Sequence, residues 1–180
     1  MKKILAFSVI VLLLSAVLSA QQSEFKKGDQ VFNFGIGFGS TLYSGIGNTS
    51  IIPPVSASYE FGVVDKIIDN GVIGIGGYAG FMKYKWNNTY GMANYGNFII
   101  GGRGVFHYPL VDKLDTYTGI MLGYDVVSTS GSSGQYSGSE SRPVASWFIG
   151  GRYYFDRNFA VMAELGYGVA VINFGISLKL

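Results

Sequence analysis

Apolar and polar residues alternate along most of this chain, which is the spacing of a β-strand and not of a helix. In the segment 32–39, one set of alternate positions is apolar and the other is small or polar. These sets are Phe32, Phe34, Ile36 and Phe38 against Asn33, Gly35, Gly37 and Gly39. The segment 172–180 repeats the pattern. Each such strand would have one apolar face and one face of glycine, serine and asparagine.

Eight segments alternate in this way and predict strands at 30–43, 54–64, 72–85, 95–108, 116–127, 143–155, 159–168 and 170–180. A tilted strand crosses a bilayer with about 9–11 residues. The connections comprise short turns at 65–70, 109–115 and 156–158 and longer polar loops at 44–53, 86–94 and 128–142. Short connections at one end and long ones at the other are typical of outer-membrane barrels. The pattern therefore predicts an all-β fold, an eight-stranded antiparallel up-and-down transmembrane β-barrel.

The first twenty residues, MKKILAFSVIVLLLSAVLSA, have the features of a secretory signal peptide. A charged start at Lys2 and Lys3 leads into an apolar run and then small residues, with cleavage expected after Ala20 or, alternatively, after Ser19. A membrane anchor is less favoured, because the run is shorter than the ~20 residues of a spanning helix. The predicted organisation is a signal peptide at 1–20, a short N-terminal segment at 21–29 and the barrel at 30–180.

The composition agrees with a chain that is not surrounded by water. Hydrophobic residues make up 48% of the 180 residues and charged residues only 13%, about half the usual charged share. The absence of cysteine excludes disulfides, thiolate metal sites and a lipid-modified cysteine. Lys2 and Lys3 are 2 of the 13 basic residues, so 11 remain against 11 acidic residues after cleavage. A neutral chain without a basic patch is not expected to bind nucleic acid.

Two similar stretches, FIIGGRGVFHY and WFIGGRYYF, each place one arginine within an apolar, aromatic strand. Arg103 and Arg152 both lie on the strand face opposite the large apolar residues. A guanidinium facing lipid at mid-depth would cost about 2–4 kcal/mol. Spacing and energetic cost therefore both predict that the two arginines point into the barrel.

Charges buried in the barrel need partners. Glu60 and Glu164 share the polar face of their strands and lie at a similar depth to the arginines, because all four are four to six residues from a short turn. Side chains fill the interior of an eight-stranded barrel. We therefore expect a structural network of Glu60, Glu164, Arg103 and Arg152, with inward glycines leaving room for it. Asp125 also has the inward spacing, nearer the other end.

Two other arrangements fit the alternation less well. A soluble periplasmic ligand-binding barrel would turn the apolar face inward, but its outer face would then carry glycine, serine and asparagine with about one charge per strand. A small porin-like channel would need an open interior, whereas small barrels lack the wide lumen of the sixteen-stranded porins. Both remain alternatives at this point.

Catalytic chemistry is not expected. The only histidine, His107, is followed by Tyr108 and Pro109, which does not match the histidine-x-serine arrangement of the deacylase barrels. The chain has no G-x-S-x-G motif, metal-ligand cluster or P-loop. We expect His107 to be a hydrogen-bonded interior or interfacial residue, and we expect no enzyme activity, cofactor or metal.

The stretches IIGGRGVFHY and FIGGRYYF and the ending FAVMAELGYGVAVINFGISLKL resemble the small outer-membrane barrels of the OmpX and OmpA-transmembrane-domain type. This resemblance implies a monomeric protein in the outer membrane of a Gram-negative cell, inserted among its lipids by the barrel-assembly machinery. It implies a structural or surface-interaction role through the extracellular loops. The final residue, Leu180, departs from the aromatic residue with which the family usually ends.

Overall fold

The computed structural model describes residues 24–42, 48–88, 91–131 and 137–180. The predicted signal peptide at 1–20 lies outside the described residues. Within the described part of the chain, no helix is long and apolar enough to cross a membrane.

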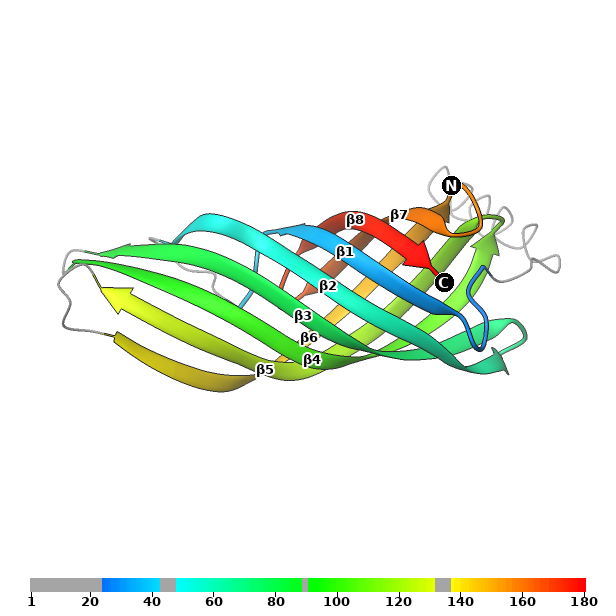
Figure 1. Ribbon diagram of the computed structural model, residues 1–180, viewed down its shortest axis with the longest axis horizontal. Helices are drawn as coiled ribbons and strands as arrows, with labels where there is room; N and C mark the ends of the chain where they lie inside the picture. The colour runs from blue at the N-terminus through cyan, green and yellow to red at the C-terminus, as the bar shows by residue number, and fades with distance from the viewer. Residues whose placement is uncertain (1–23, 43–47, 89–90, 132–136) are drawn as a thin grey trace, which may run out of the picture.

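Eight strands form a closed barrel in which each strand pairs antiparallel with its neighbours in sequence and β1 pairs with β8 (Figure 1). The strands are β1 (Gln30–Phe38), β2 (Asn48–Ile67), β3 (Gly71–Asn88), β4 (Gly91–Val111), β5 (Leu114–Gly131), β6 (Ser137–Tyr154), β7 (Phe159–Tyr167) and β8 (Ile172–Lys179). Closure leaves no unpaired edge along the wall that all eight strands share, as an apolar surrounding requires.

Strands β2 to β6 are 18 to 21 residues long, whereas β1, β7 and β8 have only 8 or 9. The five long strands therefore project beyond the closed wall at one end, on the left in Figure 1. We call this the extended end, and the opposite end, with the β2–β3, β4–β5 and β6–β7 connections, the turn end. The extension forms an open, five-stranded sheet.

The prediction of long loops was wrong for most of their length. Described residues of 44–53, 86–94 and 128–142 belong to strands, and β3 and β4 stay paired as far as Asn88 and Gly91. Polar residues and glycine dominate these segments, so their composition predicts loops. A strand that projects beyond an apolar surrounding loses the apolar alternation but keeps its hydrogen-bonded partners. The predicted first strand, 30–43, was too long, since β1 ends at Phe38.

The predicted turn at 109–115 was also too long. β4 continues to Val111 and β5 begins at Leu114, so only Asp112 and Lys113 connect them. Lys113 adopts a left-handed backbone with φ of 64°, which tight two-residue hairpin turns commonly require. As a result, Asp115 lies inside a strand and not in a turn.

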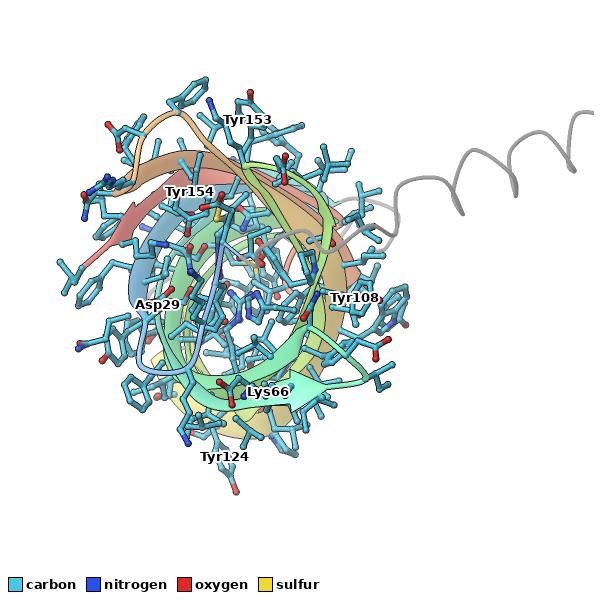
Figure 2. The ribbon with its side chains drawn as sticks, turned by 90° about the vertical axis from the view of Figure 1, so that its right-hand side faces the viewer. Asp29, Lys66, Tyr108, Tyr124, Tyr153 and Tyr154 are labelled. Carbon is cyan, nitrogen blue, oxygen red and sulfur yellow. The ribbon has the colours of Figure 1, made fainter. Side chains whose placement is uncertain are left out.

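The outward face of the barrel is apolar. Large side chains there are exposed to 38–61%, and they include Phe34, Ile36, Phe81, Phe98, Ile100, Ile120, Leu122, Trp147, Ile149, Phe174 and Leu178. Figure 2, which looks along the barrel from the turn end, shows Tyr124 and Tyr153 projecting away from the ring. The opposite arrangement, an apolar interior with a polar exterior, is the one that a soluble barrel requires. The exposed apolar face therefore argues against that alternative.

The N-terminal segment closes the turn end of the barrel. Phe25 is fully buried, and its ring stacks on the His107 ring with centroids 4.1 Å apart. The segment is held to β8 through Lys179, whose Nζ donates to the Glu24 carbonyl at 2.6 Å and lies 3.5 Å from the Asp29 carboxylate. Alternation along the sequence did not predict this plug, because Phe25 lies outside any alternating run.

Candidate functional site

The turn-end half of the interior holds a cluster of four charged side chains. Arg152 donates from Nη2 to Glu60 Oε2 at 2.5 Å and from Nη1 to Asp115 Oδ2 at 3.0 Å. His107 contacts both carboxylates, Asp115 through Nδ1 at 2.8 Å and Glu60 through Nε2. At most 1% of each of these four side chains is exposed. This arrangement links β2, β4, β5 and β6 across the lumen, and we call it the His107 cluster.

The partners of His107 favour its protonated form. Each ring nitrogen faces a carboxylate oxygen, and an ionised carboxylate only accepts hydrogen bonds. With both carboxylates ionised, both nitrogens donate and the ring is an imidazolium cation. Two cations, Arg152 and His107, then balance two carboxylates, Glu60 and Asp115. The neutrality of the cluster explains how four charges can be buried together, because unpaired buried charge is strongly unfavourable.

A second charged pair lies farther from the turn end. Arg103 donates from Nη2 to Glu164 Oε1 at 2.7 Å and from Nη1 to the Ser58 hydroxyl at 3.2 Å. The Tyr117 hydroxyl donates to Glu164 Oε1 at 3.0 Å, and the Asn173 amide donates to Oε2 at the same distance. Each carboxylate oxygen of Glu164 is thus hydrogen-bonded. We call this the Arg103 pair.

The aromatic ring of Tyr117 connects the two groups. The Arg152 guanidinium carbon lies 4.5 Å from the centre of the Tyr117 ring, and the Tyr117 hydroxyl contacts Glu164. The Arg103 guanidinium carbon similarly lies 4.0 Å from the centre of the Phe148 ring. Cations over aromatic faces gain roughly 0.5–2 kcal/mol, more when desolvated. The interior is therefore one continuous polar and aromatic core and not two isolated ion pairs.

Inward glycines provide the space that these side chains occupy. A β-carbon on Gly74 would come within 2.6 Å of Glu60 Oε1, and one on Gly150 would come within 2.9 Å of Glu164 Cγ. Both distances are too short for real contacts. A side chain at either position would collide with a neighbouring carboxylate side chain and, at Gly150, also with the Ala163 carbonyl oxygen at 2.7 Å.

The structure places the four residues of the expected network in the interior, but as two ion pairs and not as one four-residue network. Glu60 contacts Arg152, and Glu164 contacts Arg103. Sequence reasoning missed Asp115, which was assigned to a turn although it shares the inward spacing of Tyr117 on β5. His107 was expected to be a hydrogen-bonded interior or interfacial residue, and the structure places it in the interior.

The geometry of the His107 cluster gives no sign of catalysis. An imidazolium with both nitrogens donating has no lone pair to act as a base. The described residues include no group of three or more histidine, cysteine or acidic side chains placed to hold a metal ion. Beside the Arg103 pair, the lumen leaves a cavity of about 40 Å³, lined in part by Tyr78, Met121 and Ala170. That space is enough for only a few water molecules.

A third polar group lies toward the extended end. The Asn97 amide donates to both oxygens of Asp125 at 2.9 Å. Arg142 donates to Asp125 Oδ2 from Nε at 3.2 Å and from Nη2 at 3.1 Å. Asp125 is fully buried, whereas the Arg142 side chain is 44% exposed. Asp125 was expected to face inward near this end, but Arg142 was assigned to a loop.

The closed ring of eight strands, the apolar exterior and the charged interior together define a small β-barrel of the outer-membrane type. The chain is similar to the N-terminal β-barrel domain of OprF from Pseudomonas aeruginosa, with a TM-score of 0.50 and 14% identity over 86% of this chain and 98% of that chain. It is also similar to Ail, the attachment invasion locus protein of Yersinia pestis, with a TM-score of 0.51 and 12% identity over 86% and 99%. A structure of Ail in complex with the heparin analogue sucrose octasulfate gives the same values.

No protein-family model and no curated protein sequence matches the chain. At 12–14% identity, the structural similarity establishes the fold alone. The predicted fold class, an eight-stranded antiparallel barrel of this type, is confirmed.

Proposed function

We propose that this protein is an integral outer-membrane β-barrel that acts at the cell surface as a structural or surface-interaction protein. The observation that carries this proposal is the distribution of polarity. The outer face of the closed wall is a continuous band of Phe, Ile, Leu and Trp, whereas the paired charges are inside. Only a lipid surrounding makes both the apolar outer face and the charged interior favourable. The proposal includes a monomer surrounded by outer-membrane lipid and inserted by the barrel-assembly machinery.

The extended end supports the interaction role. Five paired strands project beyond the closed wall there, and a rigid sheet outside the membrane offers a larger contact surface than short turns. Ail, a barrel of this fold, is an attachment invasion locus protein, and its name is consistent with contact at the cell surface. The extended end is therefore the surface that would meet a partner.

Gel mobility of fractionated membranes tests the location and the closed barrel together. We expect the protein in the outer-membrane fraction and a faster band for the unboiled sample, because a closed barrel resists detergent until heated. Arg103→Glu, which places a second carboxylate beside Glu164, is the control that should lose the faster band. A protein found in the soluble fraction, with one mobility in both samples, would contradict the proposal.

A small channel is the second candidate, and the interior argues against it. The His107 cluster and Phe25 fill the turn end, and the cavity beside Arg103 measures about 40 Å³. Conductance in a planar bilayer decides between the two. We expect no stable steps from the purified barrel. Reproducible large steps that persist after repurification would establish a channel instead.

A further inference from the structure

We propose that the inner face of the extended end binds a neutral saccharide ring. The site is a concave region formed by Tyr84, Tyr95, Val127, Thr129, Glu140 and Arg142, which we call the outer cup. These residues come from β3, β4, β5 and β6. The proposal rests on the proposed function, in which this end of the barrel faces the outside of the cell.

The outer cup has room for a ligand because one wall position lacks a side chain. Its volume is about 490 Å³, within the roughly 300–1,000 Å³ usual for small-molecule sites. Tyr95 pairs with Thr129, and Thr129 pairs with Gly138 on β6. A β-carbon on Gly138 would have no atom within 4 Å. The glycine therefore leaves the wall open on the far side of Thr129 from the two tyrosines, in contrast to Gly74 and Gly150, whose space is filled.

One side of the outer cup is aromatic. Tyr84 and Tyr95 are directly paired across β3 and β4, and their rings stack with centroids 5.1 Å apart and planes 12° from parallel. Aromatic faces carry negative charge density and attract the weakly positive C–H groups of a flat ring, while the tyrosine hydroxyls offer hydrogen bonds. A stacked pair is also rigid, so little conformational entropy would be lost on binding.

The other side is polar and held in place. The Arg142 guanidinium contacts Asp125 through Nε and Nη2, which fixes its plane, and the buried Asp125 is itself held by the Asn97 amide. Two residues away on the same face of β6, Glu140 is exposed and can accept hydrogen bonds. The remaining guanidinium N–H groups of Arg142, held in place beside a carboxylate acceptor, suit a ligand edge that carries several hydroxyl groups.

The charge of the outer cup indicates a neutral ligand. Glu140 and Arg142 line the outer cup, and the buried Asp125 already pairs with Arg142, so the formal charge of the three groups is negative. Lys83 and Lys85 occupy the alternate positions of β3 and belong to its other face. A sulfated or carboxylated chain would meet repulsion from this charge. A pyranose has one face of C–H groups and an edge of hydroxyls, which matches the aromatic side and the polar side together.

Binding to an array of neutral and sulfated oligosaccharides, with the barrel purified in detergent, tests this inference. We expect retention of at least one neutral oligosaccharide. Gly138→Phe should reduce its affinity at least tenfold, since the new ring fills the outer cup without displacing a neighbour. Gly96→Phe is the matched control, because Gly96 faces outward on β4 and also has open space around it. Tyr95→Ala should weaken binding, and Tyr124→Ala on the outer face should not.

Several outcomes would overturn the inference. These are retention of sulfated sugars only, no retention of any neutral sugar by the folded barrel, or equal losses for Gly138→Phe and Gly96→Phe. The boiled and unboiled gel bands of each variant show that it is folded. A heat-modifiable outer-membrane barrel that binds no sugar overturns this inference alone. A sugar-binding protein found outside the outer membrane overturns the proposed function alone.

Discussion

Arg152 Nη2 lies 2.5 Å from Glu60 Oε2, although 92 residues separate the two in the chain. Their strands, β6 and β2, lie on opposite sides of the ring of eight. The ion pair therefore spans the lumen and can form only after the barrel has closed. It links the two walls of the turn end at full burial, where removal of either partner leaves an uncompensated charge.

Replacement of Arg152 by alanine should strongly destabilise the barrel. Breaking a buried pair by removing one partner costs about 3–5 kcal/mol, because the remaining charge is left buried, and here both Glu60 and Asp115 lose a donor. Urea unfolding in detergent, followed by gel mobility, measures the loss. Arg157→Ala, in the exposed β6–β7 connection, is the control and should change stability by less than about 0.5 kcal/mol. Similar losses in the free energy of unfolding for both variants would mean that the buried ion pair does not stabilise the barrel more than an exposed arginine does.

Charge exchange should reveal which glutamate partners which arginine. Arg103→Glu should prevent folding, since it places two carboxylates together, and adding Glu164→Arg should restore a folded band. Adding Glu60→Arg should not, because Glu60 contacts Arg152 and not Arg103. Refolding yields in detergent provide the measurement. Equal rescue by either second change would show that the interior charges are interchangeable.

Loss of the His107 cation should be partly offset by loss of one carboxylate. His107→Gln leaves Glu60 and Asp115 facing Arg152 alone, so we expect destabilisation of about 3–5 kcal/mol. Adding Asp115→Asn restores the charge balance and should recover a measurable part of that loss. The double-mutant cycle is read from urea unfolding. Strict additivity of the two changes would argue against a charged His107.

The Phe25 plug should control access to the single histidine. His107 is the only histidine in the chain, so exchange of its ring N–H protons with solvent, followed by NMR, reports its exposure. The ring protons of the folded wild type should exchange slowly because Phe25 stacks on the ring. They should exchange faster in Phe25→Ala. The control Phe155→Ala removes an outward ring that is 57% exposed and should exchange as the wild type does. Slow exchange in both variants would mean that the charge cluster alone shields His107.

The β6–β7 connection contains a carboxylate that titrates at unusually low pH. The backbone N–H groups of Asn158 and Phe159 donate to Asp156 Oδ1 at 2.8 and 2.7 Å, and these bonds lower the pKa of Asp156. A lowered pKa in the folded state means that the stabilisation is present above the unfolded value, about 3.9, and is lost as the pH falls through the folded value. The turn should therefore weaken only in strong acid.

Amide proton shifts of Asn158 and Phe159 measure this titration by NMR. We expect a midpoint below about 3.9 in the wild type and no titration in Asp156→Asn, whose amide oxygen can accept at every pH. Asp112→Asn, in the β4–β5 turn, is the control and should leave the midpoint unchanged. A wild-type midpoint at or above the ordinary aspartate value would contradict the expected hydrogen bonds.

Local alternation was enough to predict the eight strands, the closed barrel fold and the inward direction of Arg103 and Arg152. A strand's two faces are set by a period of two, so the environment of each face can be read from neighbouring residues alone. Alternation did not predict that β2 to β6 continue as strands into the extended end. Outside an apolar surrounding, a paired strand and a loop have similar composition. Only the presence of a hydrogen-bonded partner strand distinguishes the two.

Pairing within the interior was decided by the tertiary structure. Spacing placed Glu60, Glu164, Arg103 and Arg152 at similar depths, but which carboxylate meets which guanidinium depends on the registers around the whole ring. Phe25 is fully buried because it packs on His107. That contact can form only after the strands have paired. Sequence determined which face each residue occupies because that is a local property. Long-range register and closure determined its partners, because those depend on residues as many as 92 positions apart.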